Sequence, residues 1–174
     1  DPNLVEICVL KRSISLSVKN DASFIVAMDL NMYEHQSTYN PNMPLRDLFY
    51  VTDVLKPTLS SKDLFGTKLI KIPTPHFVVF YNGLTKRPAK EIFKLSDAFE
   101  NPTNTPELEL IVTCYNINPG NNEDFMNKCN VLSNYMIFVN KIREYRSIDN
   151  DEDNIEDSVD KAIHYCIDNN ILKD

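Results

Sequence analysis

The feature that most constrains the fold is a pair of strand-like segments separated by two residues. Residues 21–27 and 30–39 are rich in β-branched and aromatic side chains, and Met28-Asp29 between them suits a tight turn. This pattern predicts an antiparallel hairpin in which Ala27 faces Leu30. Because each further pair in a hairpin keeps the same register, the turn also fixes which residues lie opposite one another.

The predicted register brings polar side chains onto one face of the hairpin. Ser23 faces Glu34, Asp21 faces Gln36, and alternate residues of a strand point to the same side. Two half-buried carboxylates repel each other unless a cation joins them, and Mg²⁺ is often held by one or two carboxylates with water and phosphate. The spacing therefore indicates a metal site at which Gln36 orients a water or contacts phosphate. A turn aspartate and a solvated glutamate would give the same spacing.

The segments that follow the hairpin alternate between helix and strand patterns, which is typical of an α/β protein. A strand is also expected within residues 5–18. After Asn40-Pro41, a helix is predicted that ends before Pro57 and has an apolar face at Leu45, Leu48, Phe49, Thr52 and Leu55. Residues 76–81 form a continuous apolar run, which predicts a strand buried on both faces.

The second half of the chain predicts two more strands and two helices. The strands are expected at 91–95 and 108–116, and a helix with two apolar stripes, buried on more than one side, at 123–145. An acidic linker then precedes a last amphipathic helix. We expect a core domain over residues 1–148, with residues 149–174 packed on the same domain.

Composition narrows the function classes. Three glycines leave no Gly-rich phosphate loop, and the four cysteines are far apart in apolar stretches, which indicates buried thiols in a reducing cytoplasm. No apolar run is long enough for a membrane span, and no signal peptide is evident. The net charge of −7 argues against non-specific attraction to nucleic acid. An opening Asp1-Pro2 without methionine is compatible with a fragment.

Several motifs of this chain resemble one known family. They are Asn20-Asp21, Tyr33-Glu34-His35-Gln36-Ser37-Thr38-Tyr39-Asn40-Pro41-Asn42-Met43-Pro44-Leu45-Arg46, Ile72-Pro73-Thr74-Pro75, Phe80-Tyr81-Asn82-Gly83, Leu95-Ser96-Asp97-Ala98-Phe99 and Asn116-Ile117-Asn118. Together they cover nearly the whole chain and resemble the recombination-promoting nuclease (Rpn) family, also described as putative transposases, within the PD-(D/E)XK nuclease superfamily.

The resemblance implies a fold, a reaction and a site. The fold would be a restriction-endonuclease-like α/β core, with a mixed sheet containing an antiparallel hairpin, a crossover helix, and C-terminal helices. Asp21 and Glu34 would be the metal ligands, and Gln36 would complete the catalytic set where many members have lysine. The cofactor would be Mg²⁺, or Mn²⁺ or Ca²⁺, and the partner would be DNA. Because glutamine carries no charge, water activation would then depend more on the metal.

Other candidate residues have two interpretations each. Arg46 is placed to reach a substrate phosphate, or to form a surface ion pair with Asp47 or Asp53. His35 is expected on the opposite face from Glu34, as a packing residue. A DNA-facing basic surface would need several cations to gather in space, and scattered surface lysines are the alternative. These cations are Lys11, Arg12, Lys19, Lys68, Lys71, Lys86, Arg87 and Lys90.

The leading hypothesis is a metal-dependent DNA endonuclease linked to recombination or mobile DNA. The alternative is a catalytically inactive nuclease-fold domain that binds DNA or protein, which the acidic net charge favours. A hydrolase of another phosphate ester is a third reading. A homodimer is left open by these residues, and the long helix around Leu132 is where an interface would be sought.

Overall fold

The computed structural model describes residues 5–8, 22–26, 29–149 and 155–171. Contacts divide the chain into two compact units, Asp1–Asn116 and Ile117–Asp174. The division falls after the last strand, whereas the sequence placed a boundary at residue 148. Each unit is described by itself below.

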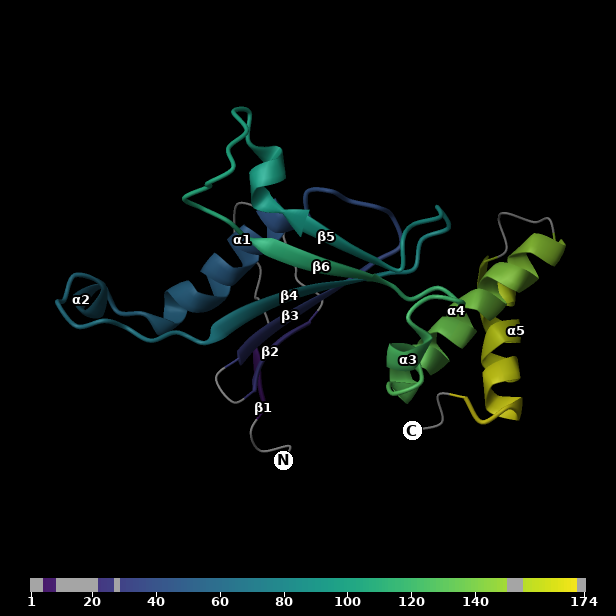
Figure 1. Cartoon of the computed structure of the whole chain (residues 1–174). Helices are drawn as coiled ribbons and strands as arrows, with labels where there is room; N and C mark the ends of the chain where they lie inside the picture. The colour runs from purple at the N-terminus through teal and green to yellow at the C-terminus, as the bar shows by residue number, and fades with distance from the viewer. Residues whose placement is uncertain (1–4, 9–21, 27–28, 150–154, 172–174) are drawn as a thin grey trace. The chain divides into compact units, whose positions relative to one another are not determined.

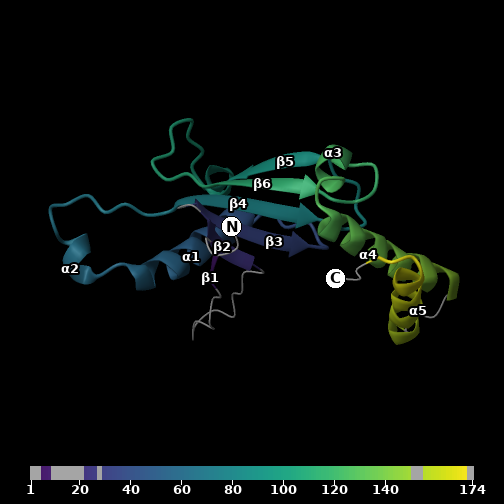
Figure 2. The same cartoon turned by 90° about the horizontal axis from the view of Figure 1, so that it is seen from below.

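The first unit is built on a mixed six-stranded sheet with the order β1-β2-β3-β4-β6-β5. The strand β2 is antiparallel to both of its neighbours, β1 and β3. The strand β4 is parallel to its two neighbours, β3 and β6, and the edge strand β5 is antiparallel to β6. Figure 2 shows β3, β4, β6 and β5 side by side in this order. The α/β class is thus confirmed. The strands are Val5–Cys8, Ala22–Val26, Asp29–Gln36, Thr74–Tyr81, Lys90–Lys94 and Ile111–Asn116.

The predicted hairpin forms, but with a different register. Val26 lies opposite Asp29 and Ser23 lies opposite Met32, so the predicted pairing of Ser23 with Glu34 is wrong. Leu30 likewise pairs with Ile25 instead of Ala27. The pairing has slipped by an even number of residues, which leaves each side chain on its original face. Asp21 lies outside the described residues, so its predicted pairing with Gln36 does as well.

A crossover helix connects β3 to the parallel strand β4, as predicted. It is α1, Met43–Leu55, and Figure 1 shows it beside the sheet. Its first turn contains Pro44, where the missing N–H group costs no helical hydrogen bond. The helix is followed by the short helices η2, Lys56–Thr58, and α2, Ser61–Leu64.

The buried face of α1 differs from the predicted one. Leu45 and Phe49 are 42% and 49% exposed, while the buried residues are Met43, Pro44, Asp47, Tyr50 and Val54. Tyr50 and Val54 pack against Leu30 and Met32 of β3. The predicted apolar stripe is therefore only partly right. Leu48 and Leu55 pack against the core, whereas Leu45 and Phe49 point outward and Asp47 and Tyr50 turn inward.

The strand β4 is central in the sheet, yet it is not buried on both faces as predicted. Val79 and Tyr81 are buried in a core cluster with Met43, whereas Val78 and Phe80 are only half-buried. Phe80 stacks on Tyr33 of the neighbouring strand, with 5.5 Å between ring centroids. The core therefore sits on the α1 side of the sheet. A last short helix in this unit, η3, spans Leu95–Ala98.

The second unit contains three helices, α3 (Glu123–Met126), α4 (Asn130–Asp149) and α5 (Ile155–Asp168). The single helix predicted over 123–145 is interrupted, since the amide groups of Lys128 and Cys129 bond three residues back and close a turn. Met136 of α4 is buried and Val131 is 75% exposed, while Tyr135, Phe138 and Ile142 of the second predicted stripe are half-buried. The predicted burial on more than one side is therefore met only in part. In the described part of the chain, no helix is long and apolar enough to cross a membrane.

Candidate functional site

The predicted site residues Glu34 and Gln36 lie near the end of β3, on the face that α1 covers. Exposed fractions of 6% and 9% show that both side chains are buried. His35 between them is half-buried, which confirms the predicted alternation along the strand. Asp21 and Lys19, the other predicted residues, lie outside the described part of the chain. The structure therefore brings together two of the three predicted catalytic residues and does not place the third.

Arg46 joins the buried polar groups of this site. Its Nη2 atom donates to Glu34 Oε1 at 2.5 Å and to the Tyr50 hydroxyl oxygen at 2.8 Å. The Gln36 side-chain amide forms two hydrogen bonds in one of its two orientations. Its oxygen accepts from Arg46 Nη1 at 3.1 Å, and its nitrogen donates to the Thr38 carbonyl at 3.3 Å. One guanidinium thus holds a carboxylate, an amide and a phenol. The partner of Arg46 is Glu34, and neither of the two aspartates considered from the sequence.

The helical geometry of α1 explains how this network is assembled. Arg46 and Tyr50 are four residues apart, so they lie on neighbouring turns of one helix face. The Arg46 guanidinium carbon lies 5.7 Å from the centroid of the Tyr50 ring. The Arg46 side chain is 35% exposed while that of Glu34 is 7% exposed. The ion pair therefore has one end in the core and one end at the surface.

Asp47 is a second buried acid beside this network, and sequence reasoning gave it no role in the site. It is 3% exposed, and burial raises its pKa from 3.8 to about 7. The negative charge of Glu34 raises the pKa further, whereas the Arg46 guanidinium lowers it. The site thus contains a second acidic group, whose pKa responds to the charges of both Glu34 and Arg46. The only sequence signal for Asp47 was its position next to Arg46.

A surface pocket of about 390 Å³ opens over the polar network. It is lined by Glu34, His35, Gln36, Ser37, Thr38, Tyr39, Asn40 and Arg46. Its Tyr39 ring lies 3.8 Å from the guanidinium carbon of Arg87 and makes an edge contact with Phe93 at 5.8 Å between centroids. Arg87 is itself held by two hydrogen bonds to Glu91, at 2.9 and 2.5 Å. Contacts from β5 and the connection that precedes it therefore fix one wall of the pocket.

The donor atoms of this pocket suit a hard cation only in part. Carboxylate and amide oxygens are the ligands that Mg²⁺ accepts, and Glu34 and Gln36 supply them. Within the described residues, however, no group of three His, Cys, Asp or Glu side chains could hold a metal ion. The Arg46 guanidinium also occupies Glu34 Oε1. A cation at this site therefore needs a further ligand and must compete with Arg46.

The other cations named from the sequence fall into separate places. Lys68 and Lys71 line one pocket in the segment between α2 and β4. Arg87 pairs with Glu91, and the Lys90 ammonium lies 5.5 Å from the Tyr115 ring centroid. Lys86 is exposed in the connection before β5. Lys11 and Arg12 lie outside the described residues.

Comparison of the chain with family models, with curated proteins and with solved structures gives no match. The resemblance to recombination-promoting nucleases therefore depends on the sequence motifs alone.

Proposed function

We propose that the pocket at Glu34 and Gln36 is the site of a metal-dependent DNA endonuclease. The observation that carries the proposal is a buried carboxylate and a buried amide side by side under an open pocket, with a cationic side chain at the rim. Carboxylates so placed are the usual protein ligands of metal ions that act on phosphate esters. The setting would be the cytoplasm and the biological role recombination or mobile DNA; a homodimer would bring two sites to one duplex.

The order of the elements supports this proposal. Three antiparallel strands lead into α1, and α1 leads into β4, which is parallel to β3. The resemblance to PD-(D/E)XK nucleases implies three antiparallel strands, a crossover helix and a fourth strand in this order, after a leading helix that is not among the described elements. Glu34 and Gln36 lie near the end of β3, ahead of the crossover helix, and this location supports the proposal of Glu34 as a metal ligand with Gln36 beside it.

The three predicted catalytic residues and Arg46 each have a role in this proposal. Asp21 and Glu34 would hold the Mg²⁺ ion, which when bound supplies an activated water and stabilises the charge that develops on the phosphate. The Gln36 amide would orient the water, since it can both donate and accept a hydrogen bond. Arg46, which is partly exposed, would exchange Glu34 for a phosphate oxygen of the substrate.

One observation favours the second candidate, an inactive nuclease-fold domain that binds DNA or protein. The guanidinium of Arg46 already bridges the Glu34 carboxylate and the Gln36 amide. Such a network satisfies the buried charge without a metal ion. In that case the pocket would stabilise the fold and would have no catalytic task.

Plasmid cleavage separates the two candidates. We expect the protein to nick or cut plasmid only with Mg²⁺, and Glu34→Ala to slow the reaction about 100-fold or more, as loss of a transition-state contact does. The matched control is Glu107→Ala, which removes an exposed carboxylate away from the pocket. Cleavage by Glu34→Ala at the parental rate would show that the site is wrong. A parent that shifts DNA on a gel but never cuts would support the inactive domain.

A further inference from the structure

The segment between α1 and β4 contains a group of lysines that the proposed active site does not use. Residues 56–71, here called the lysine arm, carry four lysines and one aspartate, a net charge of +3 in a chain of net charge −7. Figures 1 and 2 both show α2, which belongs to this arm, away from the strands of the sheet. The arm is thus a local reversal of charge at the edge of an acidic protein.

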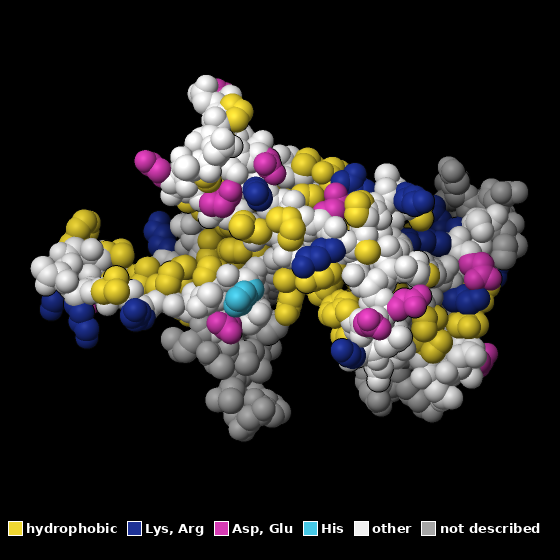
Figure 3. Space-filling model, in the orientation of Figure 1, with side chains coloured by type: hydrophobic (Ala, Val, Ile, Leu, Met, Phe, Trp, Pro, Cys, Tyr) yellow, Lys and Arg dark blue, Asp and Glu magenta, His cyan; other side chains and the backbone are white. Residues whose placement is uncertain are grey.

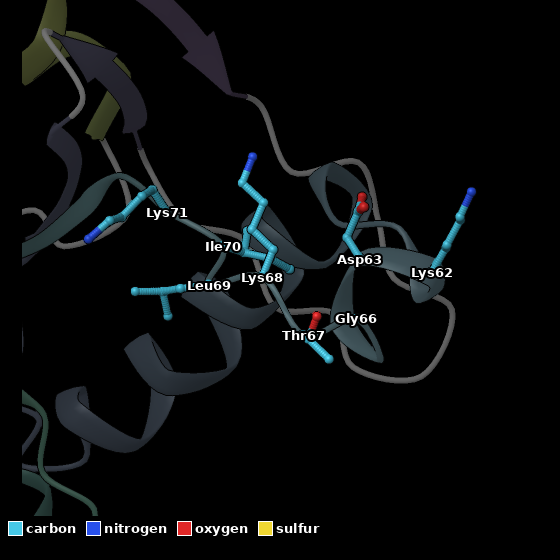
Figure 4. A pocket seen from close by; sticks show the side chains of 8 residues that line it. All are labelled: Lys62, Asp63, Gly66, Thr67, Lys68, Leu69, Ile70 and Lys71. Atoms are coloured by element: carbon cyan, nitrogen blue, oxygen red, sulfur yellow. The ribbon is translucent and has the colours of Figure 1, made fainter.

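From this arrangement we infer that the lysine arm binds the phosphate backbone of double-stranded DNA through Lys62, Lys68 and Lys71. These side chains surround a pocket of about 570 Å³ together with Gly66 and Thr67. Figure 4 shows them extended from the backbone with their amino groups well separated. Amino groups that lie apart can each contact a different phosphate along a polymer. To bind a single phosphate, they would have to point toward one place. The choice of DNA among polyanions rests on the proposed function.

The arm has a defined local structure that presents these lysines. The Ser60 hydroxyl oxygen accepts a hydrogen bond from the Asp63 amide at 3.1 Å, and the Gly66 amide donates to the Asp63 carbonyl at 3.0 Å. The Ser60 hydroxyl also donates to the Asp63 carboxylate at 2.5 Å. The one acidic side chain of the arm is therefore engaged in holding the turn.

The charges of the arm remain available to a ligand. Lys62, Lys68 and Lys71 are exposed, and none of them forms an ion pair with another residue that the structure describes. Lysines that contact neither an acidic side chain nor an aromatic ring keep their full attraction for phosphate. Each DNA phosphate that such a lysine neutralises releases counterions condensed on the duplex. The arm is thus suited to a contact that positions DNA and reads no sequence.

The apolar residues of the arm raise the alternative of a lipid surface. Phe65 and Leu69 are 91% and 76% exposed. Figure 3 shows dark-blue side chains at the lower edge of the arm, and yellow side chains both at its upper edge and across its middle, beside the blue ones. Membrane-surface segments bury apolar groups while their cations stay at the interface. The well-separated amino groups of the three lysines suit the successive phosphates of a duplex, and this favours the DNA backbone.

Salt-dependent binding of a short DNA duplex tests the inference. The full chain would be titrated in EDTA, so that no cleavage occurs, over about 50 to 200 mM salt. In Lys62→Gln/Lys68→Gln/Lys71→Gln, we expect the slope of log affinity against log salt to fall by about 2.7, since each lost phosphate contact removes about 0.9. We also expect at least a tenfold loss of affinity near 100 mM salt, roughly equal for unrelated sequences.

The matched control removes the same charge elsewhere. Lys86→Gln/Lys94→Gln/Lys128→Gln also loses three exposed cations, and it should keep the parental slope. Equal slopes for the two triple variants would overturn the inference. So would a parent that sediments with phosphatidylserine vesicles but does not bind the duplex, because the lysines would then serve a lipid surface.

The two proposals fail in distinguishable ways. If the duplex binds through the arm but Mg²⁺ yields no Glu34-dependent cleavage, the nuclease proposal fails and the arm inference stands. If Glu34-dependent cleavage occurs and the arm variant keeps the parental slope, the arm inference fails alone.

Discussion

Ionisation of Asp47 is expected to affect the stability of this protein. Its carboxyl is 3% exposed, and burial, with the Glu34 charge added, raises its pKa from 3.8 to about 7 against the opposing effect of Arg46. As pH rises, the unfolded chain releases this proton near pH 3.8, while the native protein keeps it until about pH 7. Asp47 therefore contributes stability that is fully present below the lower value and is lost as pH rises through the higher one.

The size of this effect follows from the two pKa values. Their difference, between 3.8 and about 7, corresponds to roughly 4 kcal/mol of unfolding free energy at about 1.4 kcal/mol per pKa unit. Most proteins unfold at a cost of only about 5 to 15 kcal/mol. Ionisation of one side chain would thus remove a substantial part of the stability.

Replacing Asp47 with asparagine tests this reasoning, because the amide keeps the size of the carboxyl but cannot ionise. We expect the unfolding free energy of Asp47→Asn, relative to the parent, to increase by roughly 4 kcal/mol between about pH 4 and about pH 8. Urea denaturation at both pH values measures it, and Asp97→Asn, an exposed aspartate, is the control. A difference between variant and parent that does not change with pH would refute the argument. In a Glu34→Gln background the change should be smaller, because one of its causes is absent.

Two further substitutions test packing around the site. Arg46→Leu should lower the unfolding free energy by about 2 kcal/mol, because buried Glu34 loses its cation. Urea denaturation measures this loss, which should be smaller when Glu34→Gln is also present. Gly83→Ala should cost a similar amount, about 2 kcal/mol, because a Cβ atom there would collide with the Ser37 carbonyl oxygen and the Tyr81 ring. An unchanged thermal midpoint for Gly83→Ala would show that these neighbours move aside.

The order of elements in the first unit was predictable because each leaves a periodic trace in the sequence. The strand β3 alternates buried and less buried residues along its length, and α1 ends in the region where Pro57 predicted a stop. The hairpin register was not predictable, because a slip of two residues leaves every side chain on the same face. What the sequence identified correctly is therefore which face Glu34 and Gln36 share, and not which residues lie opposite them.

The orientation of α1 was missed for a different physical reason. Hydrophobic periodicity selected the stripe through Leu45 and Phe49, which the structure leaves about half exposed. The helix instead turns Asp47 and Tyr50 inward, where Tyr50 packs on β3 and Arg46 reaches the buried carboxylate of Glu34. A count of apolar residues cannot detect a contact whose partner is twelve residues away on another element. The identity of the charge partner was thus beyond the reach of local patterns.

The Arg46 network also determines how the proposed nuclease site would have to operate. In the described structure the guanidinium lies on Glu34 Oε1, one of the oxygens that a metal ion would need. Arg46 can leave this position at little cost only if another cation replaces it at Glu34, since a buried carboxylate without a cation is destabilising. The metal ion would be that cation, and a phosphate of bound DNA would receive the guanidinium. Because coupling between two ligands is reciprocal, DNA and the ion would then each strengthen the binding of the other.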